Sequence, residues 1–208
     1  MYRYSYVFKW CGYNASIRTG IIGVVYYVLF ICVYYLWWYG QILWKIQSNS
    51  IFKDIAPAGL NAFGTCSSSA TIPISLKCAS EKIGIPEEIT SLTLPLGATI
   101  NMDAVSILMS FMITFFATAL GIDLSIGTMV TVLACNVLLS IGTPSVPGGA
   151  IAAFAALCPI AGIPTNQILG VYISVNTLCD MGATCVNVIG DLACSTVLKQ
   201  TLHFDKKK

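Results

Sequence analysis

The stretch Leu96–Ile107, which reads LGATINMDAVSI, decides the fold because it places polar residues inside an apolar segment. Asn101 and Asp103 follow a Gly-Ala-Thr run, and the surrounding residues 86–120 contain no Lys or Arg. A continuous helix of this length would extend about 50 Å, more than one bilayer crossing requires. We therefore predict a helix break within residues 97–103. A carboxylate at this depth, with no Lys or Arg in its own segment, must be protonated, reach water or hold a cation, and we favour a small cation at Asp103.

The composition indicates a polytopic membrane protein. The chain has 208 residues, of which 56% are hydrophobic and 10% charged, and its mean hydropathy is +0.78. Soluble domains contain about 25% charged residues. Residues 21–44 and 124–179 carry no formal charge, and each run exceeds the roughly 20 residues that span a bilayer as a helix. The net charge of +2 comes without a basic face, which argues against nucleic acid as a partner.

The nine cysteines lie mostly in apolar runs and form no C-x-x-C pair. We interpret them as small apolar side chains rather than disulfides or zinc ligands. A membrane-embedded redox or metal protein that uses Cys179, Cys185 and Cys194 is a weaker alternative, because no second ligand cluster accompanies them.

Two interruptions of similar chemistry divide the chain into repeated units. GTCSSSATIP (64–73) and SIGTPSVPGGA (140–150) are rich in residues that oppose helices, and each predicts a re-entrant hairpin. The order hairpin, broken helix, hairpin, polar helix is a repeat of architecture. Breaks in corresponding positions of two halves point to a binding site, and such backbone must be buried in protein or line a cavity. We therefore expect the breaks to face each other.

The predicted elements follow from these interruptions. They are an unassigned segment 1–18, a helix 19–45, a hairpin 50–83, a broken helix 86–120, a hairpin 123–161, a helix 164–198 and a basic tail 199–208. Lys residues gather at one set of ends, whereas the turns at 121–128 and 160–166 have no Lys or Arg. The positive-inside rule then places the C-terminus in the cytoplasm, although Arg3, Lys9 and Arg18 fall on the opposite side.

A polar stripe runs along the last predicted helix. Spacings of 4, 3 and 4 put four polar side chains on one helical face, namely Asp180, Thr184, Asn187 and Asp191. A stripe with two carboxylates is not expected to face lipid. It either lines a binding site or bonds to neighbouring helices, and we favour the binding site for the set while both interpretations stand for Thr184 alone.

Four motifs, SSSATIP, LPLGATINMD, SIGTPSVPGG and DMGATCVNVIGD, closely resemble those of the dicarboxylate/amino acid:cation symporter family, which includes the glutamate transporters. The resemblance runs from Thr19 to Leu198. It implies an all-α polytopic membrane protein with re-entrant helical hairpins and a discontinuous helix, as in the transport domain of glutamate-transporter-like proteins. Family members have eight membrane helices and form homotrimers. This chain would hold the sixth helix onward, as expected for a truncated or split product or a fragment.

The resemblance implies two sodium sites and part of a third. The first comprises the carbonyls of Gly97, Asn101 and Asn187 with the Asp191 carboxylate. The second comprises Thr99, Met102 and the carbonyls of Ser140, Ile141 and Thr143. The third uses Asn101 and Asp103, with its remaining ligands on the third helix of the family.

The resemblance also implies a substrate site between the two hairpin tips and the polar stripe. Its members would be Ser67, Ser68, Ser69, Val146, Pro147, Gly148, Asp180, Ala183, Thr184 and Asn187. Asp180 would bind the α-amino group of an amino acid, and Asn187 its α-carboxylate.

Departures from the family pattern indicate the substrate class. Members that carry acidic amino acids place an arginine at the position of Ala183, and some relatives place one at the position of Cys66. Neither position offers a bidentate partner for a carboxylate here. Asn176 replaces an acid near that arginine, and Val105 replaces a hydroxyl residue. These changes favour a neutral substrate such as serine, alanine, threonine or a cystine-like amino acid, with a dicarboxylate or acidic amino acid as the alternative.

The implied function is sodium-coupled symport by an elevator-type mechanism, with protons as the alternative coupling ion. The resemblance implies no enzyme activity and no covalent cofactor. Its partners would be a small-molecule amino acid, sodium ions and membrane lipid, with a homotrimer at full length and a multi-pass location in the plasma membrane. A truncated, non-transporting module that assembles with or regulates a full-length partner is a second alternative.

Overall fold

The computed structural model of the chain describes residues 51–202. The predicted segment 1–18, the predicted helix 19–45 and residues 203–208 of the tail lie outside the described residues. Every regular element in the described part is helical, which confirms the all-α fold. In chain order these elements are α3 (Ile51–Thr65), α4 (Ser68–Lys77), a π-helical turn η1 (Cys78–Ile83), α5 (Glu87–Ile100), α6 (Asp103–Leu120), α7 (Ile126–Ile141), α8 (Gly149–Ile160) and α9 (Thr165–Thr201).

The first hairpin reverses at Cys66 and Ser67, between α3 and α4. Cys66 has a left-handed backbone with φ of 51°, which is uncommon for a residue with a side chain. Ser67 is extended, and its hydroxyl caps α4 by accepting a hydrogen bond from the Ala70 N–H at 3.1 Å. Ser68 and Ser69 therefore lie in the first turn of α4, and the reversal is shorter than the three-serine interruption suggests.

The predicted discontinuity in the long helix is present at Asn101 and Met102. Pro86 precedes α5, and Glu87 and Glu88 occupy its first turn. Their negative charges interact favourably with the positive end of the helix dipole. Helical backbone continues through Gly97, so the break is narrower than residues 97–103. It falls where ψ of Asn101 and Met102 leaves the helical range, at 83° and 39°.

The second hairpin consists of α7 and α8, joined by the loop 142–148. Ser125 caps α7 by accepting a hydrogen bond from the Thr128 N–H at 3.1 Å. Two glycines shape the start of α8. Gly148 has a left-handed backbone with φ of 77°, and any Cβ at Gly149 would collide with the Pro144 carbonyl. The loop can therefore fold tightly onto the first turn of α8.

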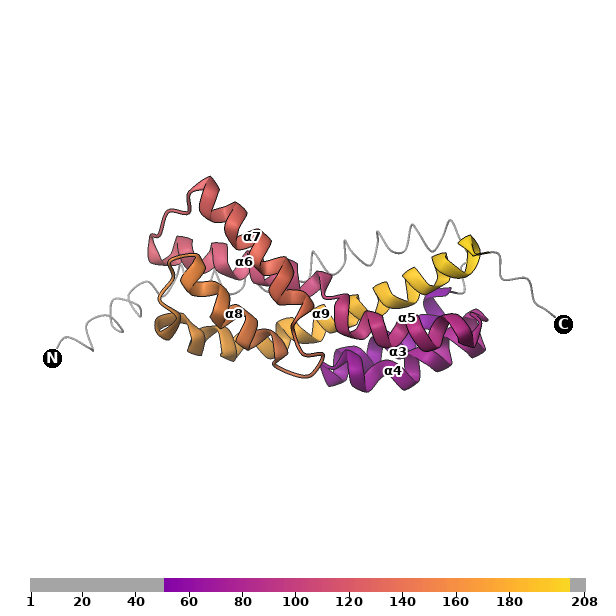
Figure 1. Cartoon of the computed structure of the whole chain (residues 1–208). Helices are drawn as coiled ribbons and strands as arrows, with labels where there is room; N and C mark the ends of the chain where they lie inside the picture. The colour runs from indigo at the N-terminus through magenta and orange to yellow at the C-terminus, as the bar shows by residue number, and fades with distance from the viewer. Residues whose placement is uncertain (1–50, 203–208) are drawn as a thin grey trace.

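Helix α9 is the axis of the fold (Figure 1). One apolar cluster joins its second half to α3, η1 and α5, and another joins its first half to α6, α7 and α8. Figure 1 shows these two groups of helices along opposite ends of α9, with the helix breaks between them. The span Glu87–Leu120 and α9 are long and apolar enough to cross a membrane, whereas α7 and α8 are shorter apolar helices.

Candidate functional site

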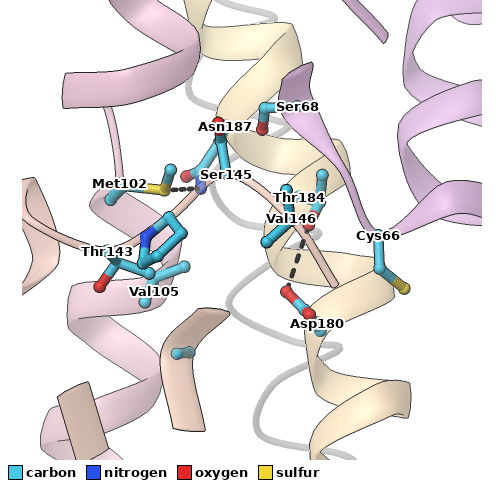
Figure 2. Close-up of a pocket in the computed structure, with 12 residues that line it drawn as sticks. Cys66, Ser68, Met102, Val105, Thr143, Ser145, Val146, Asp180, Thr184 and Asn187 are labelled. Atoms are coloured by element: carbon cyan, nitrogen blue, oxygen red, sulfur yellow. Dashed lines mark hydrogen bonds between the residues drawn. The ribbon is translucent and has the colours of Figure 1, made fainter. Parts of the chain in front are cut away.

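A small pocket lies where the two hairpin tips, the break before α6 and the middle of α9 meet (Figure 2). Its volume is about 10 Å³, roughly the room that one water molecule requires. The lining residues are Cys66, Ser68, Met102, Val105, Thr143, Pro144, Ser145, Val146, Ala150, Asp180, Thr184 and Asn187. Segments far apart in the sequence thus share one small pocket.

The two hairpin tips contact each other directly. The Ser67 hydroxyl donates a hydrogen bond to the Ser145 carbonyl at 2.9 Å, and the Ser69 N–H donates to the same oxygen at 3.4 Å. The hydroxyls of Ser69 and Ser145 are also hydrogen-bonded to each other. Ser67 caps α4 as well, so one side chain both ends the reversal of the first hairpin and holds the second.

The Asp180 carboxylate joins α9 to the second hairpin. Its Oδ2 accepts a hydrogen bond from the Gly148 N–H at 3.1 Å, and its Oδ1 accepts one from the Thr184 hydroxyl at 3.3 Å. Asp180 is only 7% exposed. Figure 2 shows Asp180, Thr184 and Asn187 following one another along the same face of α9. A buried carboxylate with these neighbours can bind a cationic group such as an ammonium.

The Asn187 side chain joins α9 to the first turn of α6. Its Oδ1 accepts a hydrogen bond from the Ala104 N–H at 3.0 Å, and its Nδ2 contacts the Met102 sulfur at 3.6 Å (Figure 2). The Ala104 N–H is one of the donors that a helix start leaves without a partner inside the helix. The Asn187 oxygen therefore supplies the hydrogen-bond acceptor that the Ala104 N–H lacks at the helix break, while the Asn187 side chain remains in the pocket wall.

A second polar cluster lies one helical turn further along α9. The Asn101 Nδ2 donates hydrogen bonds to Asp191 Oδ1 at 2.8 Å and to the Asn187 carbonyl at 3.3 Å. Gly97 packs so closely that any Cβ there would overlap the Asp191 carboxylate. Asp103 lies within electrostatic range of Asp191. Neither α5 nor α6 contains a Lys or Arg, so the cluster offers carboxylate and carbonyl oxygens, which hard cations prefer.

Residues 17–201 match the sodium:dicarboxylate symporter family. The chain belongs to this family. Human excitatory amino acid transporter 2 is 36% identical over 142 residues, which cover 68% of this chain and 25% of that protein. Human neutral amino acid transporter A is 36% identical over 146 residues, which cover 70% of this chain and 27% of that protein. An excitatory amino acid transporter of Caenorhabditis elegans is 37% identical over 139 residues, or 67% of this chain and 27% of that protein.

These comparisons confirm the family resemblance: the family is described as one of symporters, and the relatives are named as transporters rather than enzymes. The chain spans about a quarter of the length of the relatives that it matches. The relatives' names include both excitatory and neutral amino acid transporters at similar identity, so the comparisons do not separate these two substrate classes.

The residues expected to bind substrate are partly brought together. Five of them line the pocket: Ser68, Val146, Asp180, Thr184 and Asn187. Ser67 and Ser69 hold the second tip, and Gly148 bonds to Asp180. Pro147 is exposed and does not line the pocket, and Ala183 is buried in an apolar cluster and does not line it either. The polar side chains thus converge, whereas the Ala183 side chain has no direct share in the wall.

The residues expected to bind sodium are also only partly brought together. Gly97, Asn101, Asn187 and Asp191 form the contacts described above. Of the second set, Met102 and Thr143 both line the pocket and Ser140 is buried, whereas Thr99 and Ile141 are exposed. Asp103, expected to hold a cation, is also exposed on the surface formed by the described residues.

Five lining residues were not predicted as binding residues, and three of these were not singled out at all: Pro144, Ser145 and Ala150. All three lie within the second interruption, SIGTPSVPGGA, so that motif offered a signal. The sequence could not show which of its atoms turn inward, because this depends on the left-handed Gly148 and on the packing of Gly149 against Pro144. Cys66 and Val105, noted as departures from the family pattern, both line the pocket.

Proposed function

We propose that this chain carries the substrate and cation sites of a sodium-coupled symporter for a neutral amino acid. The observation that carries the proposal is the pocket between the hairpin tips, which has an Asp180 carboxylate, an Asn187 amide and no Lys or Arg among its described lining residues. The substrate's ammonium group would pair with Asp180. Its carboxylate would accept hydrogen bonds from the Asn187 amide and from the serine loop Ser67–Ser69.

The wall next to these groups supports a neutral side chain. Cys66, Val105 and Ala150 line the pocket and are small or apolar, and the buried Ala183 carries no charge. A second substrate carboxylate in this pocket would be buried without a cationic partner, which costs several kcal/mol. Serine, alanine, threonine or a cystine-like amino acid is therefore the proposed substrate class, ahead of an acidic amino acid or a dicarboxylate.

The proposed coupling ion is sodium, held first by Gly97, Asn101, Asn187 and Asp191. The contacts from Asn101 to both Asp191 and the Asn187 carbonyl support this set. A second sodium is proposed at Thr99, Met102, Ser140, Ile141 and Thr143, and a third at Asn101 and Asp103. Asn187 belongs to the cation cluster through its carbonyl and to the substrate pocket through its side chain. A cation that orders Asn187 would therefore raise substrate affinity, and the reverse holds equally.

Transport requires the pocket to open, because its volume of about 10 Å³ is far too small for an amino acid. The proposed gate is the hairpin α7–α8. Opening it breaks the Ser67–Ser145 and Gly148–Asp180 hydrogen bonds. An incoming ammonium would then take the place of the Gly148 N–H at Asp180, and the closed hairpins would move with their cargo in an elevator-type movement.

The setting of this unit is also proposed. Residues 19–198 would form the C-terminal part of the transport domain of a multi-pass plasma-membrane protein, with the tail 199–208 in the cytoplasm. Helices that belong to the rest of the family architecture would complete a homotrimer.

Uptake into liposomes tests the proposal. The purified chain is reconstituted, and uptake of radiolabelled serine and aspartate is measured with and without an inward sodium gradient. We expect sodium-dependent serine uptake that D180N abolishes, with little aspartate uptake. Sodium-independent uptake would overturn the coupling, and a preference for aspartate would overturn the substrate class. If serine uptake requires co-reconstitution with a full-length relative, the chain acts as a module of a larger assembly.

A further inference from the structure

Helix α7, the first arm of the second hairpin, touches the rest of the molecule along a narrow seam. Its buried residues are Val132, Asn136 and Ser140, spaced four apart on one face. Many of its other side chains are apolar and exposed, including Val130, Leu133 and Leu138. Asn136 is therefore an amide in the middle of the face on which the arm rests.

The Asn136 amide is fully buried and holds α7 against α6. Asn136 is 0% exposed, and its Nδ2 donates hydrogen bonds of 2.7 Å to the Ser106 carbonyl and 2.7 Å to the Ser110 hydroxyl. Both amide protons are thus used. The two acceptors lie one turn apart on α6, so the contact fixes the position of α7 along that helix.

The other end of the amide is unsatisfied. Asn136 Oδ1 is buried and has no hydrogen-bond partner among the described residues. A buried acceptor without a donor destabilises the arrangement that buries it, and this penalty is comparable to the gain from hydrogen bonds such as those made by Nδ2. If the arm moves away from α6, Oδ1 can reach water and the penalty disappears. The amide therefore gives the closed arm a defined position without a large net stabilisation.

The acceptors of this contact lie close to the break that begins α6. The Ser106 N–H donates to the Met102 carbonyl at 2.9 Å, which places Ser106 in the first turn after the discontinuity. Met102 lines the pocket and contacts Asn187. The arm of the second hairpin is thus attached to the same helical turn that carries the pocket wall.

We propose that Asn136 is the positioning residue of the second hairpin, and that its half-satisfied amide keeps the closed and open positions of this hairpin close in free energy. This inference rests on the proposed gating role of α7–α8. If the contact served only to hold the two helices together, any replacement of it would destabilise the closed hairpin. A balanced gate instead predicts that replacing the polar pair with an apolar pair holds the hairpin closed, because apolar partners have no acceptor left unsatisfied.

Hydrogen–deuterium exchange of the full chain in nanodiscs tests the proposal without substrate. The readout is the exchange rate of the loop amides 142–148 relative to those of α9. S110A leaves one Asn136 proton unpaired and should speed loop exchange about five- to tenfold. The double variant N136L/S110A, in which the lost hydroxyl gives room to the leucine, should slow loop exchange by a similar factor. V130A, on the exposed face of α7, should change the loop-to-α9 ratio by no more than about twofold, because Val130 is 62% exposed and its truncation removes no hydrogen bond and little packing.

The proposal predicts opposite changes in loop exchange for S110A and for N136L/S110A. Faster loop exchange in N136L/S110A, or equal loop-to-α9 ratios in S110A and the wild type, would overturn the positioning role. Sodium and serine added to the wild type test the proposed function separately, by protecting the loop. Absent protection, together with the expected effects of the variants, would count against the substrate class and leave the role of Asn136 standing.

Discussion

Gly97→Ala is the sharpest test of the proposed sodium site. An ideal Cβ at this position lies 2.6 Å from Asp191 Cγ and 3.1 Å from Asp191 Oδ2. Non-bonded carbon atoms prefer about 3.5–4.0 Å, so the carboxylate must retreat by about 1 Å. The 2.8 Å hydrogen bond from Asn101 to Asp191 then approaches or passes the limit of a useful bond. The substitution should therefore displace a proposed ligand without changing any charge.

The magnitude follows from the lost contact. A hydrogen bond to a charged group contributes about 1.5–3 kcal/mol. If the sodium site requires the present position of Asp191, the dissociation constant for sodium should rise about 10- to 100-fold. Helix propensity acts in the opposite direction, since Gly→Ala within a helix stabilises by about 0.5–1 kcal/mol. The variant should therefore remain folded.

The assay is the sodium dependence of thermal unfolding of the purified chain, because a ligand that binds the folded state raises its stability. G170A is the matched control. Gly170 lies within α9, and no atom lies within 4 Å of its Cβ position. We expect G170A to keep the wild-type sodium midpoint and G97A to shift it. A G97A midpoint within about twofold of the wild type would refute the assignment of Asp191.

Three further predictions separate the parts of the site. D180N should abolish the thermal stabilisation by serine but leave that by sodium intact, because Asp180 belongs to the pocket and not to the Asn101–Asp191 cluster. Equal losses of both stabilisations would contradict this separation. S145A removes the hydroxyl contact with Ser69 but keeps the Ser145 carbonyl bond to Ser67, so serine affinity measured by thermal shift should fall about two- to tenfold; an unchanged affinity would show that the tip hydroxyls do not hold the gate. A183R should change the preference from serine towards aspartate by about tenfold or more in competition uptake, because a guanidinium offers a bidentate partner to a carboxylate. A retained preference for serine would show that residue 183 is too far from the bound substrate.

Local chemistry allowed much of the fold to be predicted. The break before α6 was found because Asn and Asp interrupt an apolar helix that has no basic partner. The start of α5 at Pro86 was found from its proline and the two glutamates after it. The stripe on α9 was found because a helical period places residues 180, 184, 187 and 191 on one face, and all four are buried.

The candidate site was less predictable, because its contacts join distant residues. Ser145 was not singled out, although its backbone and side chain connect both hairpin tips. The sequence does not indicate a role for Asn136, since one amide in an apolar helix does not reveal whether it faces lipid or a neighbouring helix. Ala183 was expected at the substrate, but it is buried and does not line the pocket.

Sequence alone is enough to predict where the chain is helical, where it is interrupted and which polar residues share one face of α9. These properties depend on neighbours within about two helical turns, where backbone preference and the helical period act. Only the tertiary structure decided that Gly97 lies against Asp191, that Ser145 joins the two tips and that Asn136 holds α7 on α6. Each of these contacts joins separate segments, and their geometry arises when α9 packs against both halves at once.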